Sequence, residues 1–308
     1  MLHPKAPGGR VAPGKRSSGR GMATHLGLIG GSGLYGLPLA GAAWREMDTP
    51  WGAPSDAILT GTLDGVPVSF LPRHGRGHVH APSDLPSRAN IAALKALGVT
   101  DIVSISAVGS FREEMAPGHI VVVDQFVDRT TARPSSFFGT GCVAHVSLAE
   151  PTCPRLSGLA ADAALAAGAT VHRGGTYLCM EGPQFSSRAE SRIWRDAWHC
   201  DVIGMTAMPE ARLAREAEFC YATLAMVTDY DSWHEGHGAV DVSAVLAVLA
   251  ANVEAARDLA ALLPGRLGES HPCPHGCDRS LDHAVMTALD RRDPALVERL
   301  RIVAGRVL

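Results

Sequence analysis

The stretch Thr24-His-Leu-Gly-Leu-Ile-Gly30-Gly-Ser-Gly33 is a short apolar run that ends in glycines. Such a run is typical of a buried strand that leads into a tight loop. Working outward from it, further runs typical of strands lie at Ile58–Leu63, Val66–Leu71, Asp101–Ala107, His119–Val127, Val171–Met180, Asp201–Met205 and Cys220–Thr228. Helical patterns occupy Arg88–Leu97, Leu156–Ala167, Ser187 to about Trp198, Glu210–Glu218 and a long stretch from about Asp241. This alternation predicts an α/β fold with a mixed, mostly buried sheet.

The composition supports a folded, loop-rich enzyme. The 308 residues are 46% hydrophobic and 19% charged, which excludes disorder along the whole chain. The 33 glycines and 20 prolines argue against a helical bundle. The longest apolar candidate for a membrane span, Val240–Leu263, carries four charged residues and is better explained as a core-facing helix. We therefore expect no association with a membrane.

The net charge of −3 is unevenly distributed. Residues 1–21 hold five basic residues and no acid, which leaves −8 on the remainder. The glycines and prolines of this tail would break an amphipathic targeting helix, and Met22 stands just before the first strand. We expect residues 1–22 to be a disordered basic tail and 23–308 to form a single domain. Binding to nucleic acid would depend on the tail alone and is not expected.

The cysteines indicate a reducing compartment. All seven lack the spacing of a disulfide framework, which favours free thiols in the cytoplasm. One cluster, His271-Pro-Cys-Pro-His-Gly-Cys277, could suggest zinc. Structural zinc sites usually draw their ligands from two separated knuckles, and no second pair of cysteines stands near this one in the sequence. The favoured interpretation is an irregular loop that precedes a C-terminal helix and binds no metal.

Gly31-Ser-Gly33-Leu-Tyr-Gly36 formally matches a dinucleotide-binding fingerprint. That fingerprint must open a continuous helix, whereas here Pro38 and Gly41 follow. An NAD(P)-dependent oxidoreductase is therefore only a remote alternative. The alternative use of these glycines is an anion cradle, in which backbone amides and the Ser32 hydroxyl surround a phosphate.

Further segments carry groups suited to an anion. Arg73-His-Gly-Arg-Gly-His78 follows directly on an apolar strand, and the arginine fork matches phosphate oxygens, although a solvated basic loop is the plain alternative. Ser104–Ser110 and Met205–Glu210 place small or hydroxyl residues at the carboxyl ends of strands. Open α/β sheets bind their ligands there.

Two carboxylates end the most hydrophobic strand, in Thr228-Asp-Tyr-Asp231. Residues two apart on an extended segment point to the same side, and close carboxylates in an apolar setting raise one pKa. Such an acid can protonate a leaving group near neutral pH. A glycosidase would pair the acid with a carboxylate nucleophile. The upstream segments suited to binding phosphate instead suggest phosphate as the nucleophile.

The combination of motifs resembles the trimeric purine nucleoside phosphorylase family, specifically its methylthioadenosine-cleaving members. The resemblance runs from about residue 25 to about 260. It is carried, in order, by Gly30-Gly-Ser-Gly33, Asp48-Thr-Pro-Trp-Gly-Ala-Pro-Ser-Asp56, Arg73-His-Gly-Arg76, Glu181-Gly-Pro-Gln-Phe-Ser-Ser-Arg-Ala-Glu190, Met205-Thr-Ala-Met-Pro-Glu210 and Thr228-Asp-Tyr-Asp231. It implies a mixed twisted sheet that partly closes into a barrel, a homotrimer, and no metal or organic cofactor. The implied reaction is a pentosyl transfer that converts methylthioadenosine and phosphate into adenine and 5-methylthioribose 1-phosphate.

The resemblance also assigns residues to roles. It implies phosphate ligands at Ser32, Arg73, His74, Ser106 and Thr206. It places Ala107, Phe185 and Met205 against the nucleoside, and makes Asp229 and Asp231 the purine-binding and catalytic aspartates. His78, Val245 and Leu246, with His145 from a neighbouring subunit, would surround the methylthio end. Gln184 stands where many relatives have arginine, and the chain after about Pro264 matches poorly.

Hydrogen-bond complementarity favours an adenine nucleoside. A protonated aspartate at 229 donates to a purine ring nitrogen while its other oxygen accepts from a 6-amino group. A 6-oxopurine would leave that oxygen facing another acceptor. A phosphorylase for methylthioinosine or for ordinary purine nucleosides is the nearest alternative.

Overall fold

The computed structural model describes residues 23–31, 34–235, 248, 254–268 and 271–308. The predicted basic tail and the start of the predicted helix at Asp241 lie outside the described residues, as do Ser32, Val245 and Leu246. Among the described residues, no helix combines the length and the apolar character that crossing a membrane requires.

The core of the molecule is one mixed sheet of 11 strands. The strands are β1 (Leu26–Gly30), β2 (Ala40–Arg45), β3 (Ile58–Leu63), β4 (Val66–Pro72), β5 (Asp101–Ser110), β6 (Ile120–Val123), β7 (Gln125–Arg129), β8 (Val171–Arg173), β9 (Thr176–Met180), β10 (Val202–Gly204) and β11 (Cys220–Asp229). Their order is β2-β3-β4-β1-β5-β10-β9-β7, and a second branch runs from β5 through β11 and β6 to β8. The sheet therefore divides into two branches at strand β5.

Strand β5 is long enough to change partners along its length. Its first half pairs in parallel with β1, up to Ser104, and its end pairs antiparallel with β10, from Gly109. On its other edge it runs parallel to β11 along almost all of its length. Residues 105–108 therefore face a gap in the sheet, between the carboxyl end of β1 and the carboxyl end of β10.

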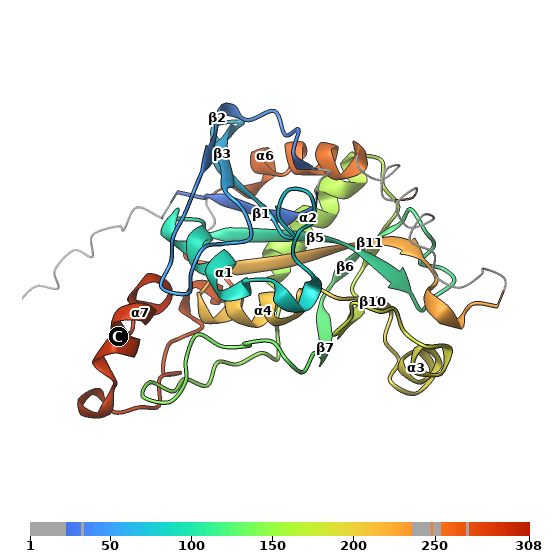
Figure 1. The fold of residues 1–308 in the computed structure, drawn as a ribbon. Helices are drawn as coiled ribbons and strands as arrows, with labels where there is room; N and C mark the ends of the chain where they lie inside the picture. Colours follow the sequence, from blue (N-terminus) through green and yellow to red (C-terminus); the bar gives the residue numbers. More distant parts are fainter. Residues whose placement is uncertain (1–22, 32–33, 236–247, 249–253, 269–270) are drawn as a thin grey trace, which may run out of the picture.

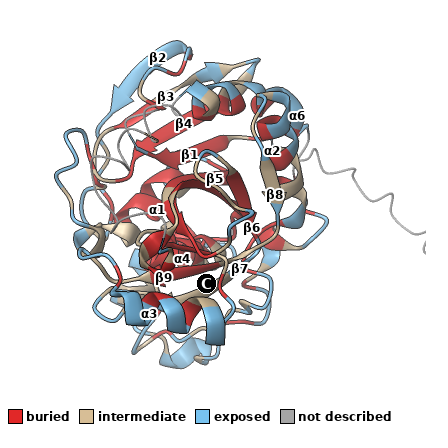
Figure 2. Cartoon of the chain, turned by 90° about the vertical axis from the view of Figure 1, so that its right-hand side faces the viewer, coloured by how far each residue is buried: buried red, intermediate tan, exposed pale blue. Residues whose placement is uncertain are grey.

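Two of the expected strands are each divided in two. The predicted strand at His119–Val127 is split at Asp124, and the one at Val171–Met180 is split at Gly174 and Gly175. Both glycines have positive φ, and the Asp124 carboxylate accepts a hydrogen bond from the Gly175 amide at 3.1 Å. Because the two breaks lie side by side, β6 and β8 follow one branch of the sheet while β7 and β9 follow the other. Figure 2 shows the buried strands curving around the interior, with β2 and α3 exposed at the periphery.

Helices cover both faces of the sheet. They are α1 (Ser87–Ala96), α2 (Pro154–Ala166), α3 (Arg188–Arg192), α4 (Ala207–Glu216), α6 (Pro264–Leu267) and α7 (Pro294–Ala304), together with residues 254–262. In Figure 1, α1, α4 and α7 lie on one side of the sheet and α2 and α6 on the other. Each side has its own apolar core, and the buried residues Leu300 and Val303 bring the C-terminal helix into the first of them.

Most predicted boundaries are confirmed. The Asp64-Gly65 turn between β3 and β4 has positive φ at both residues, as a tight hairpin requires. The helix predicted from Ser187 opens with a capping box, formed by the Ser187 side chain and Glu190, and α3 continues to Ala197 in a wider helical turn. Met208 has extended backbone within α4, so the regular helix begins at Pro209, next to the predicted Glu210.

Candidate active site

The predicted site residues converge where four strands end. Strands β4, β1, β5 and β11 are consecutive and parallel, so their carboxyl ends lie on one edge of the sheet. Arg73 follows β4, Ser106 lies on β5 in the gap described above, and Asp229 ends β11. Thr206 lies at the junction of β10 and α4, on the other side of the gap. Topology alone therefore gathers residues that are 156 positions apart in the chain.

Arg73 lies at the bottom of this gap and is only 3% exposed. Its guanidinium forms an ion pair with Glu210 at 3.1 Å. It also donates to the Ile105 carbonyl at 2.9 Å, which β1 no longer reaches, and to the Ser104 hydroxyl at 2.6 Å. Although burial works in the opposite direction, Glu210 keeps the pKa of Arg73 above its ordinary value. The arginine is thus a fixed positive charge beside the gap.

Three hydroxyl groups meet next to Arg73. The Ser106 and Tyr177 hydroxyls are buried close to each other, and neither makes a hydrogen bond of good geometry to the described residues. Burial raises the pKa of Tyr177 to about 12, while the nearby hydroxyls of Ser106 and Thr206 work against that rise. Buried hydroxyls in proteins are normally hydrogen-bonded, so an unpaired cluster in a gap indicates that a ligand supplies the partner.

His74 stands at the mouth of the gap and is neutral at neutral pH. Burial lowers its pKa to about 4, and the charge of Arg73 contributes. Its Nδ1 lies 2.9 Å from the His80 carbonyl, which only accepts, so Nδ1 carries the proton and Nε2 has a free lone pair. The ring is stacked on that of the exposed His78, with centroids 4.2 Å apart. The structure therefore brings both histidines together, as the motif predicted.

The two aspartates at the end of β11 form a connected unit. The Asp231 amide donates to Asp229 Oδ1 at 2.8 Å, and the Thr228 hydroxyl donates to Asp229 Oδ2 at 2.8 Å. Asp231 is 5% exposed, and the Ser186 hydroxyl lies 2.6 Å from its Oδ1. Burial raises the pKa of Asp231. At Gly109 on β5, a Cβ atom would lie 2.8 Å from Asp229 Oδ1, so a side chain there would displace the carboxylate.

The loop that begins at Glu181 and the loop around Met205 are held together by Arg133. This buried arginine pairs with Glu181 at 2.8 Å and donates to the Met205 carbonyl at 2.6 Å. The hydrogen bonds from Ser83, the Thr131 amide and Arg133 lower the pKa of Glu181 to about 2, against the effect of burial. Phe185, in the first of these loops, is 43% exposed, and Met205 is half-buried. Both side chains therefore remain accessible to a ligand.

Some predicted residues are not joined to this arrangement. His145 is exposed and is held by a hydrogen bond from its amide to the Ala284 carbonyl. Within the described part of the chain, no hydrogen bond or ion pair connects His145 to the gap. Ser32, Val245 and Leu246 cannot be placed because they lie outside the described residues. Ala107 is half-buried on β5, next to Ser106.

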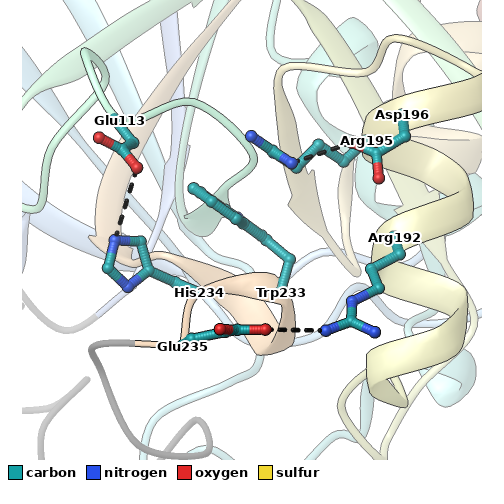
Figure 3. A pocket seen from close by; sticks show the side chains of 7 residues that line it. All are labelled: Glu113, Arg192, Arg195, Asp196, Trp233, His234 and Glu235. Carbon is teal, nitrogen blue, oxygen red and sulfur yellow. Dashed lines mark hydrogen bonds and ion pairs between the residues drawn. The ribbon is translucent and has the colours of Figure 1, made fainter.

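A separate hollow of about 350 Å³ lies beyond the aspartates (Figure 3). The Trp233 ring lies between His234 and Arg195 in this view, and its Nε1 donates to the Ser110 carbonyl at 2.7 Å. The charged lining is internally paired: Arg192 lies 3.1 Å from Glu235, and His234 lies 3.9 Å from Glu113. None of the predicted site residues lines it, so we keep the gap beside β5 as the candidate active site.

The structure also addresses the dinucleotide fingerprint. After β1 the described chain makes a single turn at Leu34–Gly36 and then enters β2 at Ala40. A dinucleotide-binding unit needs a full helix at this point, with its N-terminus on the pyrophosphate. The described residues after the loop form no such helix, so the sequence match does not mark an NAD(P) site.

Three residues of the site were not found from the sequence. Glu210 balances Arg73, Arg133 joins two loops, and Tyr177 completes the hydroxyl cluster. Glu210 and Glu181 belong to sequence motifs, but those motifs give them no role of their own. No local pattern distinguishes these residues, since their roles depend on contacts between distant segments.

These features are those of a nucleoside phosphorylase fold, and comparison with known proteins agrees. Residues 25–263 match the model of the phosphorylase superfamily, and the chain belongs to that family. It is 67% identical to S-methyl-5'-thioadenosine phosphorylase of Cereibacter sphaeroides, over 93% of this chain and 99% of the relative. It is 57% identical to the protein of that name from Bradyrhizobium diazoefficiens, over 92% and 98%.

Solved structures give the same result. A crystal structure of methylthioadenosine phosphorylase from an antarctic soil metagenomic library superposes with a TM-score of 0.86 at 44% identity, covering 91% of this chain and 99% of that one. Methylthioadenosine phosphorylase from Schistosoma mansoni, solved in complex with adenine, gives 0.75 at 36% identity, over 80% and 92%.

Proposed function

We propose that the protein is a pentosyltransferase that cleaves S-methyl-5'-thioadenosine with phosphate, releasing adenine and 5-methylthioribose 1-phosphate. The observation that carries this proposal is the unpaired, buried Ser106 hydroxyl beside Arg73, in a gap whose far end is Asp229. Ser106 and Gly109, the partner of Asp229 on β5, are three residues apart, or ~10 Å along a strand. That span leaves room for a sugar between a phosphate and a purine. The names of the relatives support the choice of nucleoside.

The charges suit phosphorolysis. The sugar passes through an oxocarbenium-like state while negative charge moves onto the purine. Arg73 and the hydroxyls of Ser106, Tyr177 and Thr206 would hold the phosphate by charge-assisted hydrogen bonds, with Glu210 keeping the arginine in place. A phosphate so fixed attacks the anomeric carbon as the bond to the base breaks. In this proposal no metal or organic cofactor takes part in the chemistry.

His74 acts as an acceptor toward this phosphate. Because Nδ1–H is directed at the His80 carbonyl, the free Nε2 accepts a hydrogen bond from a protonated phosphate oxygen. Full ionisation of the phosphate would instead draw a proton onto Nε2, since an adjacent anion raises a histidine pKa. In either case one proton is shared between the ring and the nucleophile.

The two aspartates have different roles toward the purine base. Asp229 is the general acid, protonating the departing purine and accepting from its 6-amino group. Asp231, buried and bound by Ser186, positions Asp229 through its amide. Aspartate rather than asparagine at position 229 favours adenine over hypoxanthine, because a 6-oxo group would face an acceptor.

A panel of nucleosides tests the proposal. Methylthioadenosine, adenosine, methylthioinosine and inosine are incubated with and without phosphate, and the released base is quantified by chromatography. We expect fast, phosphate-dependent release of adenine from methylthioadenosine. Preference for inosine would overturn the substrate, and release of base without phosphate would overturn the nucleophile.

We further propose a cytoplasmic homotrimer in which each site receives His145 from its neighbour. The exposed position of His145 and the free thiols of all seven cysteines support these two points. Co-expression of a His145→Ala chain with an Asp229→Asn chain tests the first. Both variants alone are expected to be impaired, and in every mixed trimer about one third of the interfaces, one of the three, pair two intact residues. Mixed trimers, isolated by two affinity tags, should therefore regain activity, and no recovery would place His145 in its own chain's site.

A further inference from the structure

Four buried cysteines meet at the end of β11 opposite the aspartates. Cys153, Cys220, Cys273 and Cys277 bring their sulfur atoms within 4.8 Å of one another. They come from three separate parts of the chain: the start of α2, the start of β11 and the loop that precedes the C-terminal helix. The sequence argument against zinc was that no second pair of cysteines lies near Cys273 and Cys277. The fold supplies that pair from Cys153 and Cys220.

The sulfur spacing matches a single tetrahedral ion. Zinc–thiolate bonds of ~2.3 Å place the four sulfurs of a tetrahedron ~3.8 Å apart. Cys153 Sγ and Cys273 Sγ are 3.8 Å apart, and all four sulfur atoms lie within 4.8 Å of one another. A disulfide would bring two sulfurs to ~2.05 Å. A cubane iron–sulfur cluster would hold the thiolates further apart, because its own iron and sulfide atoms lie between them.

The local backbone presents these thiols as a metal knuckle does. Cys273 and Cys277 are separated by three residues, within the spacing of zinc knuckles. Gly276 has a φ of +68°, and its amide donates to the Cys273 carbonyl at 3.0 Å, which closes the turn. Asp278 Oδ1 accepts from the Cys273 amide at 3.2 Å. The loop is therefore tightly folded, and both sulfurs face the same side.

Two features beside the cluster stabilise thiolates, whereas the adjacent Asp101 carboxylate works against them. Cys153 is the N-cap residue of α2, where the helix dipole stabilises a negative charge. The Arg155 guanidinium lies within hydrogen-bonding reach of the Cys220 sulfur and also pairs with Asp101. His271 lies 3.4 Å from Asp101 and 3.5 Å from Asp278, so it bridges the two carboxylates beside the cluster. Four thiolates and one zinc ion carry −2, and Arg155 offsets part of that charge.

We propose that Cys153, Cys220, Cys273 and Cys277 bind one structural zinc ion that fastens the C-terminal segment to the sheet. Four thiolates in tetrahedral geometry select zinc among the common divalent ions. The site lies nine residues from Asp229 along β11, which is ~30 Å for an extended strand. The ion is therefore remote from the reaction, and its role is to hold α7 and its preceding loop in place.

Metal content and cobalt spectroscopy test the site directly. The protein is produced without a histidine tag, and its zinc is measured by plasma mass spectrometry against protein concentration. We expect one zinc per chain, and replacement by cobalt should give the intense thiolate charge-transfer and visible bands of a tetrahedral sulfur site. Metal-free protein whose four thiols are alkylated after denaturation would overturn the proposal, as would disulfides among them seen by mass spectrometry.

Two matched variants locate the ion. Cys277→Ser removes one ligand, whereas Cys200→Ser alters a cysteine that is equally buried but outside the cluster. Cys277→Ser should lose most of its zinc and unfold several degrees lower, and Cys200→Ser should keep one zinc per chain. Removing zinc from the native enzyme with a chelator should lower Tm in the same way. Equal zinc in both variants would overturn the assignment, and the native protein's zinc content and cobalt spectrum decide the matter if Cys277→Ser fails to fold.

Discussion

The two ends of strand β11 differ in how their polar groups are satisfied. Near Asp229, the Ser106 and Tyr177 hydroxyls make no hydrogen bond of good geometry to the described residues, and Arg73, paired with Glu210, lies beside a gap in the sheet. Near Cys220, four thiols face one another, and Arg155 and His271 form ion pairs with Asp101, although some of their nitrogen atoms make no hydrogen bond to the described residues. A site for a transient ligand keeps hydrogen-bonding capacity unused, whereas a site for a permanent ion collects a full set of ligands. In our two proposals, the same strand serves turnover at one end and stability at the other.

The largest effect is expected at Arg73, because this side chain contributes to both folding stability and turnover. A substitution there tests whether the two contributions can be separated. Arg73→Met leaves Glu210 buried without its partner, which costs about 3–5 kcal/mol of folding free energy. It also removes the positive charge from the phosphate. Urea unfolding and steady-state kinetics measure the two losses. Adding Glu210→Gln should restore stability but not activity, and recovery of both would remove Arg73 from the phosphate site.

Asp229→Asn should separate turnover from stability. The amide is isosteric, and Thr228 can still donate to the Val108 carbonyl at 3.1 Å, so the fold should be retained. Loss of the general acid should lower kcat for methylthioadenosine about 10²–10⁴-fold. Acceptance of 6-oxopurine nucleosides should improve relative to that of methylthioadenosine. Unchanged kinetics in a folded variant would refute the general-acid role.

Ser106→Ala tests whether the hydrogen-bonding capacity of this hydroxyl is left free for a ligand. This hydroxyl has no partner among the described residues, so its removal should not reduce the free energy of unfolding. A hydrogen bond to a charged ligand contributes about 1.5–3 kcal/mol, so the KM for phosphate should rise roughly 10–100-fold. Tyr177→Phe provides the matched comparison at the neighbouring hydroxyl. A clear loss of stability in either variant would show that the hydroxyl has a partner within the protein.

The smallest effect is expected in the acid stability of the Glu181 loop. The pKa of Glu181 is lowered to about 2 from its ordinary value of 4.5. A lowered carboxyl pKa stabilises the fold above pH 4.5, and that contribution disappears as the pH falls toward 2. Glu181→Gln should therefore show a shallower loss of stability over this interval in thermal unfolding. Identical pH profiles would mean that Glu181 does not contribute to acid stability.

The elements and the positions of most candidate site residues at strand ends could be predicted because their signals are local. The β3–β4 hairpin follows from Asp64-Gly65, and the ends of α1 and α2 follow from Gly98 and Gly168, both of which have positive φ. The motifs around Arg73, Thr206 and Asp229 lie at the ends of strands whose apolar runs are plain. Parallel pairing then brings them to one edge of the sheet without further information.

The remaining features depend on contacts between distant segments. The apolar runs around Asp124 and Gly175 are continuous, so nothing local shows that two strands break together and the sheet divides. Cys153 and Cys220 lie far from Cys273 in the sequence and meet it only in the folded chain. A search for paired motifs at short spacing therefore misses a site whose ligands are gathered by the fold.

The pairing of β5 with β11 has a consequence for synthesis on the ribosome. Asp101 and its partner Cys220 are 119 residues apart in the chain. At a translation rate of about 5–20 residues per second, β5 is finished roughly 6–24 s before its partner exists. Strand β1 is already made and covers one edge of β5, but the other edge is unpaired during that interval, and such apolar edges aggregate. Chains truncated before Cys220 should therefore be the form of this protein that most needs a chaperone.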